Sequence, residues 1–155
     1  MSTTPSAARF SVSVPRGAVH LQAIRAFFRA VLQERCASET EALILALDES
    51  CANLLKHQCE ATAGDRLCVH ADLEPGRVQF RIDDFCSHAE VDRIQPRPIE
   101  QVRPGGLGTH FVRTIMDRVE FEPQPGRPGR MCLVLEKALP ISAVPATRKE
   151  AEHHA

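Results

Sequence analysis

The sequence predicts an α/β protein of the α+β two-layer sandwich type, in which three helices cover one face of a mixed, mostly antiparallel sheet. Apolar residues alternate with polar ones in three segments, two further segments near the C-terminus indicate strands, and apolar residues recur at helical spacing in three others. The resulting order is strand, helix, helix, strand, strand, loop, helix, strand, strand. Two pairs of strands are joined by turns, which excludes a purely parallel βαβ arrangement.

The composition is that of a globular domain. The chain has 155 residues, of which 43% are hydrophobic and 25% charged, and this length suits one domain. Its formal net charge of −1, without a basic stripe, argues against direct binding to nucleic acid. No apolar run reaches the roughly 18–20 residues of a membrane span and no signal peptide is visible, so we expect a cytoplasmic protein without membrane contact. The six cysteines include no CxxC pair and are expected to be reduced thiols.

The first part of the chain predicts a tail, a strand and a helix. Residues 1–8 are small and polar, and we expect them to be a flexible tail before a single domain at 9–138. Apolar residues at alternate positions predict a strand from Arg9 to Pro15. Helical spacing then predicts a helix from Gly17 to Arg35. Its apolar face would consist of Leu21, Ile24, Phe28, Val31 and Leu32.

The next helix, predicted from Glu39 to Gln58, is apolar on most sides and should therefore be covered on most sides. Glu49, Asn53 and His57 are spaced four residues apart, so they form one polar column along it. Two interpretations are open. The column is a partly exposed helix edge, or it is the wall of a ligand site in which Glu49 is a general base and Asn53 offers an oxygen to a hard cation.

The second half predicts a hairpin, a long loop, a helix and two more strands. The hairpin strands are Arg66–Leu73 and Arg77–Asp84, with a Glu-Pro-Gly turn between them. Residues 86–104 lack a regular pattern and are a candidate lid over a ligand. The face predicted for the third helix is Leu107, Phe111, Ile115 and Val119. A strand starting at Phe121 and a strand at Met131–Leu135 complete the domain, and residues 139–155 are expected to be a flexible tail.

Three glycines, Gly105, Gly106 and Gly108, lie where the third helix opens. Without side chains, their backbone N–H groups can approach a ligand closely, and the helix N-terminus adds a partial positive charge. This arrangement suits a phosphate group, although the sequence matches neither a P-loop nor a dinucleotide fingerprint. A hinge or a tight turn is the alternative interpretation.

These features occur together in one known family. Glu49-x-x-x-Asn53-x-x-x-His57, a strand ending in Asp, a long polar loop, Pro-Gly-Gly-Leu-Gly-Thr-His-Phe and Met-Asp-x-Val-Glu-Phe follow one another in an order that resembles the GHKL ATPases, which have the Bergerat fold. Within that family the chain looks most like the small anti-sigma-factor serine/threonine kinases. The resemblance extends over residues 10–135, and residues 103–121 are its most specific stretch.

The resemblance implies a role for each matching residue. Asn53 would bind Mg²⁺ on the ATP phosphates, and Glu49 would take the proton from the protein hydroxyl that attacks the γ-phosphate. His57 would support the site, Lys56 would touch phosphate, and Asp84 would accept the amino group of adenine. The loop around the phosphates would consist of Gly105, Gly106, Leu107, Gly108 and Thr109.

The chain departs from the family pattern after Asp84. The family usually has Asp-x-Gly-x-Gly here, whereas this chain has Asp-Phe-Cys-Ser-His, which removes backbone freedom where adenine should pack. We expect an ATP-dependent protein serine/threonine kinase that is a homodimeric anti-sigma factor, which holds a sigma factor inactive and phosphorylates an antagonist protein. The alternative is a catalytically degenerate regulator that sequesters a partner with weak or no ATP binding. A detached histidine-kinase-like ATPase domain is less favoured, since long dimerisation helices with a phosphoacceptor His are missing.

Overall fold

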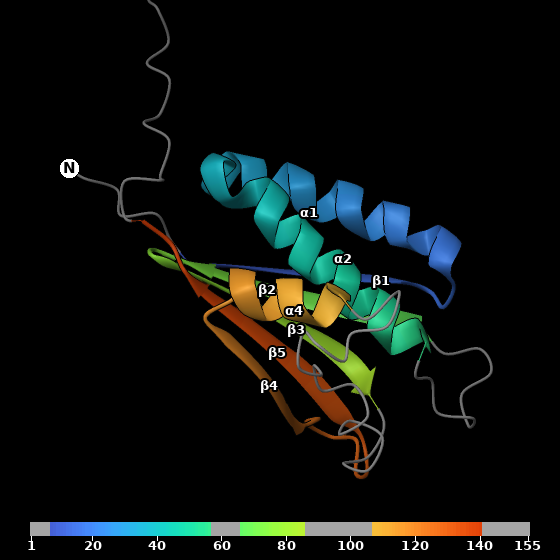
Figure 1. Ribbon diagram of the computed structural model, residues 1–155. Coiled ribbons are helices and arrows are strands. Elements are labelled where there is room, and N and C mark those ends of the chain that lie inside the picture. The colour runs from blue at the N-terminus through green and yellow to red at the C-terminus, as the bar shows by residue number, and fades with distance from the viewer. Residues whose placement is uncertain (1–6, 57–65, 86–106, 141–155) are drawn as a thin grey trace, which may run out of the picture.

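The computed structural model describes residues 7–56, 66–85 and 107–140. In this part of the chain a five-stranded sheet forms one layer, and three α-helices lie across one of its faces (Figure 1). The helices are α1 (Leu21–Arg35), α2 (Thr40–Lys56) and α4 (Leu107–Ile115). The strands are β1 (Ala8–Pro15), β2 (Arg66–Glu74), β3 (Arg77–Phe85), β4 (Arg118–Pro123) and β5 (Met131–Ala138).

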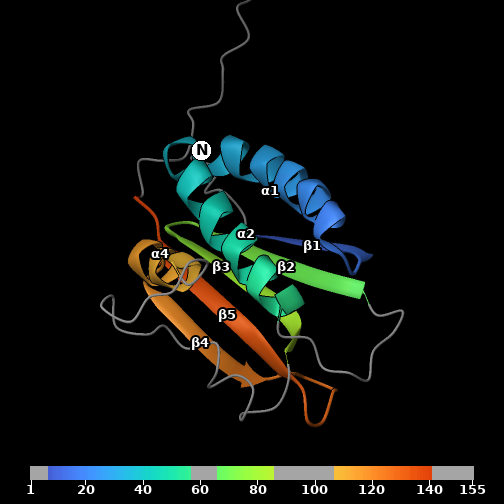
Figure 2. The same ribbon diagram turned by 45° about the vertical axis from the view of Figure 1, so that its right-hand side comes forward.

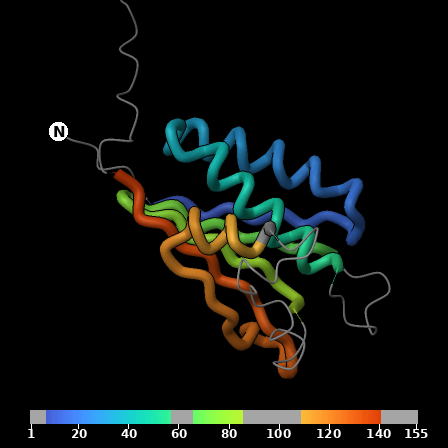
Figure 3. Tube along the Cα trace, viewed as in Figure 1, coloured from blue at the N-terminus to red at the C-terminus, as the bar shows by residue number. Residues whose placement is uncertain are grey.

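The sheet has the order β1-β2-β3-β5-β4, and every pairing between its described strands is antiparallel. Strand β5 lies between β3 and β4, while β1 and β4 form the two edges (Figure 3). The predicted two-layer α+β class is confirmed, and the sheet is antiparallel throughout these strands. For the β2–β3 and β4–β5 pairs this follows from the short connections, because a tight turn reverses the direction of the chain.

The β2–β3 hairpin forms where the sequence predicts it. Glu74 pairs with Arg77, so Pro75 and Gly76 alone form the turn. Gly76 has a φ of 78°, the value that a type II turn needs at its second central position, and proline suits the first. The carbonyl of Gly76 accepts a hydrogen bond from the N–H of Leu139 at 2.8 Å, which ties the chain after β5 to this turn.

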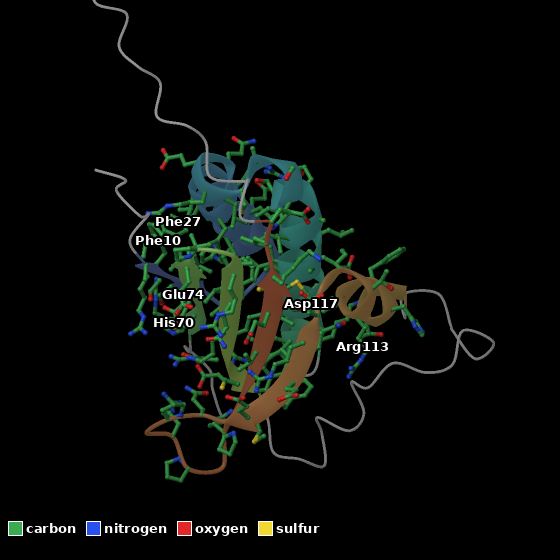
Figure 4. All side chains as sticks on the ribbon, turned by 90° about the vertical axis from the view of Figure 1, so that its left-hand side faces the viewer. Phe10, Phe27, His70, Glu74, Arg113 and Asp117 are labelled. Atoms are coloured by element: carbon green, nitrogen blue, oxygen red, sulfur yellow. The ribbon has the colours of Figure 1, made fainter. Side chains whose placement is uncertain are left out.

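The two faces of the sheet differ in character. The face under the helices is apolar, and its fully buried residues include Leu67, Val69, Ala71, Val78, Phe80, Ile82 and Leu135. The other face is polar, and Figure 4 shows His70 on the side of the sheet away from α2 and α4. Ion pairs such as Arg9–Asp72 at 2.6 Å join neighbouring strands there. This difference follows from the period of two along a strand.

An aromatic contact fixes α1 to the sheet. Phe28 is fully buried, and its ring lies edge-on to that of Phe80 in β3, with centroids 5.6 Å apart and an interplanar angle of 87°. The partly buried Val31 packs against the same core. The other buried residues of α1 are Leu21, Ile24 and Leu32. The predicted apolar stripe is therefore the face by which this helix packs.

The predicted end of the third helix is wrong. Helix α4 ends at Ile115, and Val119 lies in β4, which starts earlier than predicted. The last helical turn closes with a hydrogen bond from the N–H of Met116 to the carbonyl of Val112 at 2.9 Å. The next N–H, that of Asp117, donates to a carbonyl of β5 at 2.9 Å, so the chain enters the sheet directly after the helix.

The predicted apolar face of α4 is right at Ile115, which packs against the core, but wrong at Phe111. Phe111 has 48% of its surface exposed, whereas Val112 and Met116 are buried. Because Phe111 and Val112 are both apolar, spacing alone cannot choose between two stripes that are one residue apart. The structure shows that the stripe through Val112 faces the core.

Several predicted segments lie outside the described residues. These are residues 1–6 and 141–155 of the two tails and the candidate lid at 86–104. Strand β1 begins at Ala8, the last residue of the predicted first tail, and β5 ends at Ala138. Among the described residues, no helix has the length and apolar character that a membrane crossing needs.

Truncation of Phe28 tests the contact between α1 and the sheet. Phe28→Ala removes a fully buried ring and leaves a cavity, so we expect a loss of about 3–5 kcal/mol in the free energy of unfolding, measured by urea denaturation. The matched control is Phe111→Ala, which removes a half-exposed ring and should cost less than about 1 kcal/mol. Equal losses for the two variants would show that Phe28 does not fix α1.

Candidate functional site

Helix α2 packs against α1 on one side and α4 on the other (Figure 2). Its side chains buried in the core include Leu43, Leu47, Cys51 and Leu54. On the α1 side, Asp48 accepts a hydrogen bond from Arg25 Nη1 at 2.7 Å. Successive residues of a helix are rotated by about 100° around its axis. The edge that carries Ala46 and Asn53 therefore faces away from α1.

Glu49 and Asn53 are both half-buried on this second edge. Ala46, one turn nearer the N-terminus, is fully buried, so the edge is covered at that level. Neither Glu49 nor Asn53 forms a hydrogen bond or ion pair with another described residue, in contrast to Asp48. A half-buried carboxylate and amide that no other described residue engages are candidates for contact with a ligand.

Two further residues of the predicted site, Lys56 and His57, lie at the end of α2. Lys56 is the last described residue of α2, and its side chain is exposed. His57 lies outside the described residues. The structure thus brings Glu49 and Asn53 together on one edge, with Lys56 exposed at the end of their helix.

The start of α4 is the second part of the candidate site. Gly108 and the half-buried Thr109 belong to its first turn, while Gly105 and Gly106 lie outside the described residues. In Figure 1 the N-terminal end of α4, the C-terminal half of α2 and the end of β3 lie toward the same end of the sheet. The first N–H groups of a helix lack partners within it and carry a partial positive charge, which suits a phosphate group.

Strand β3 ends in two aspartates with different surroundings. Asp83 lies on the polar face, where its carboxylate is 2.8 Å from His70 Nε2 and accepts a hydrogen bond from Arg81 at 3.0 Å. Asp84 is only 7% exposed and lies in a bulge of the β3–β5 pairing. Its φ of 69° is the one positive value among the described residues other than glycine. Asp83 is therefore engaged on the polar face, and Asp84 is the aspartate with the unusual backbone.

Three side chains from other segments surround Asp84. Gln124 Oε1 accepts a hydrogen bond from the Asp84 N–H at 2.8 Å, and Arg16 Nη2 donates to the Asp84 carbonyl at 3.4 Å. Arg127 Nη2 lies 3.6 Å from Asp84 Oδ1, which is close enough for an ion pair but too far for a hydrogen bond. These three residues were not predicted from the sequence, because the prolines and glycines of 123–129 indicate only a turn.

The family model of the histidine kinase-like ATPase domain matches residues 14–137. The chain belongs to this family. The match includes Glu49, Asn53, Asp84 and the whole of α4, and it confirms the resemblance to the GHKL ATPases. Membership of a histidine kinase-like ATPase family implies the use of ATP and indicates an ATPase or a kinase at the level of the family.

A curated relative gives a closer comparison for this histidine kinase-like ATPase domain. The serine-protein kinase RsbW of Halalkalibacterium halodurans is 25% identical over 96 residues, which make up 57% of this chain and 58% of the relative. The chain thus spans little more than half the length of that kinase. The similarity supports the anti-sigma-factor kinase type at the level of the family.

The described residues fit a magnesium nucleotide. Mg²⁺ usually keeps several waters and takes one or two protein oxygens besides the phosphates, so the Asn53 amide oxygen beside Glu49 is a suitable donor. The described ranges contain no group of three or more His, Cys, Asp and Glu residues that could hold a metal ion. At the other end, Asp84 Oδ1 is a buried acceptor without a hydrogen-bond partner in the described part, as an incoming amino group requires.

The reactivity of the Cys51 thiol reports how tightly α2 is packed. It is fully buried, and burial, together with the nearby charge of Asp48, raises the pKa of its thiol. A protonated, buried thiol reacts slowly, so we expect iodoacetamide at about pH 8 to leave Cys51 unmodified in the folded protein and to alkylate it in urea. Mass spectrometry of peptides measures the alkylated fraction of Cys51 in the folded protein and in urea. The half-buried Cys68 is the internal control, and equal alkylation of the two thiols in the folded protein would contradict this packing.

Proposed function

We propose that this protein is an ATP-dependent protein serine/threonine kinase that also acts as an anti-sigma factor in a partner-switching system. The observation that carries the proposal is the pair of Glu49 and Asn53 on one edge of α2, half-buried and not engaged by other described residues. Membership of the histidine kinase-like ATPase family and the similarity to a serine-protein kinase support the choice of ATP and of a protein hydroxyl as reactants.

Each residue has a defined task in the proposed reaction. Asn53 holds Mg²⁺ through its side-chain oxygen, the first turn of α4 with Gly108 and Thr109 binds phosphate oxygens, and Asp84 accepts the amino group of adenine. When bound, Mg-ATP supplies the phosphoryl group. Glu49 takes the proton from a Ser or Thr hydroxyl of the protein substrate as that oxygen bonds to the γ-phosphorus, and the bond to the β–γ bridging oxygen breaks to release ADP.

The proposed partners follow from the resemblance to the small anti-sigma-factor kinases. They are a sigma factor that the protein holds inactive and an antagonist protein that it phosphorylates on Ser or Thr, with the kinase acting as a homodimer in the cytoplasm. One observation favours the alternative of a degenerate regulator without catalysis. Cys86 and His88 stand where the family has glycines, so the backbone there lacks the freedom that glycine provides.

A thermal-shift experiment separates the kinase from the degenerate regulator. A ligand at about 100 times its Kd adds roughly 2.7 kcal/mol of stability, which raises the Tm of a domain of this size by roughly 5–10 °C. We expect a rise of this size with millimolar Mg-ATP and a smaller rise with ATP and EDTA, because Asn53 acts through the metal. An unchanged Tm with Mg-ATP would favour the regulator that binds its partner without nucleotide.

Removal of the Glu49 carboxylate tests the proposed base. Glu49→Ala should keep the Tm rise with Mg-ATP but lose about 10²–10⁴-fold in the rate at which labelled γ-phosphate passes to the antagonist protein. Asp48→Asn is the matched control, because it changes the neighbouring carboxylate, which pairs with Arg25 on the other edge of α2. A Glu49→Ala protein that phosphorylates as fast as the parent would show that Glu49 is not the base.

A further inference from the structure

The backbone of Asp84 needs support from its surroundings. A φ of 69° is unfavourable for residues with a side chain, although aspartate tolerates it better than most. A bulge with this conformation usually contains glycine, and the extra residue loses its regular partner on the neighbouring strand. Such a conformation persists only where neighbouring groups hold it in place.

Gln124 supplies that support from the turn between β4 and β5. Its Oε1 lies 2.8 Å from the Asp84 nitrogen, so it accepts the hydrogen bond of the bulged residue. The turn itself is fixed by backbone hydrogen bonds, from Gln124 N–H to the Arg130 carbonyl at 2.9 Å and from Arg130 N–H to the Arg127 carbonyl at 3.1 Å. The half-buried Gln124 is therefore held at a defined place.

The carboxylate of Asp84 is buried and has an oxygen without a hydrogen-bond donor among the described residues. The Asp84 side chain is 9% exposed, and its Oδ1 has no hydrogen-bond partner in the described part of the chain. Arg127 Nη2, at 3.6 Å, supplies a positive charge without forming a hydrogen bond to that oxygen. A buried acceptor without a partner is unfavourable, so a ligand N–H group that reaches Oδ1 would gain a strong hydrogen bond.

We propose that Gln124 is the positioning residue for base recognition in this protein. It holds the left-handed backbone of Asp84 and thereby directs the buried carboxylate toward the amino group of adenine, with Arg127 as the counter-charge. In this protein the β4–β5 turn, through Gln124, would place the Asp84 carboxylate. In the family pattern, the flexible glycines after the aspartate provide backbone freedom near the base. This inference rests on the proposed binding of ATP.

Calorimetry with two nucleotides tests the inference. Mg-ATP carries the amino group on its base, whereas Mg-ITP has a carbonyl oxygen at the same place and offers Asp84 no donor there. We expect the parent protein to bind Mg-ATP about tenfold more tightly than Mg-ITP. Gln124→Met keeps the length of the side chain but loses the acceptor, so the Kd for Mg-ATP should rise about tenfold while the Kd for Mg-ITP stays the same. Gln124→Glu keeps an acceptor oxygen and should keep the preference for Mg-ATP.

The outcomes separate this inference from the function on which it rests. If Gln124→Met keeps the parental Kd values for both nucleotides, Gln124 has no role in base recognition. If its Kd rises equally for Mg-ATP and Mg-ITP, Gln124 only stabilises the fold, and the inference is again overturned. Neither outcome would contradict nucleotide binding by the parent protein. A parent protein that binds neither nucleotide would overturn the proposed function itself. Thermal unfolding checks the fold of each variant first. If Gln124→Met does not fold, Gln124→Asn, which keeps the amide but is too short to reach Asp84, provides the same comparison.

Discussion

The packing of α2 between α1 and α4 is the constraint on which the candidate site depends. A helix buried toward the sheet and toward both neighbours cannot rotate about its axis without exposing apolar surface, so each of its edges has a fixed environment. Asp48 and Glu49 are adjacent in the sequence but lie on different edges. The first carboxylate forms an ion pair with Arg25 at 2.7 Å, and the second remains half-buried beside Asn53. Helix α2 thus provides Asp48 for a structural ion pair with Arg25, and Glu49 and Asn53 for the proposed site.

Most of the fold could be predicted because its information is local. The alternation in β2 and β3 and the stripe on α1 each follow from spacing within one segment, and the Phe28–Phe80 contact joins residues that both patterns place inward. The error at α4 had a non-local cause. The hydrogen bond from Asp117 to β5 ends the helix, and nothing within residues 107–119 indicates that a strand lies there to receive it.

In the candidate site, too, the features set by local sequence could be predicted and those set by distant residues could not. Glu49 and Asn53 could be found from the sequence because four-residue spacing on a helix fixes their relation. The surroundings of Asp84 could not, since Gln124 is 40 residues away and reaches it only through the conformation of a turn. The missing glycines at positions 86 and 88 suggested a damaged binding site. The structure describes Asp84, which precedes them, and its N–H donates to Gln124, while its φ of 69° is a value that glycine usually adopts.

The place of β5 inside the sheet affects how the molecule acquires its structure. Arg77 pairs with Ala138, so β3 cannot gain its second neighbour until the chain has been synthesised as far as β5. Closing so long a loop costs entropy before any contact offsets it, and such pairings form slowly. During synthesis, the edge of β3 that later pairs with β5 would therefore remain open. A nucleotide that binds only the complete sheet would shift the folding equilibrium of newly synthesised chains toward the native state. Under the proposed function, cellular ATP would then stabilise the fold as well as serve as the phosphoryl donor.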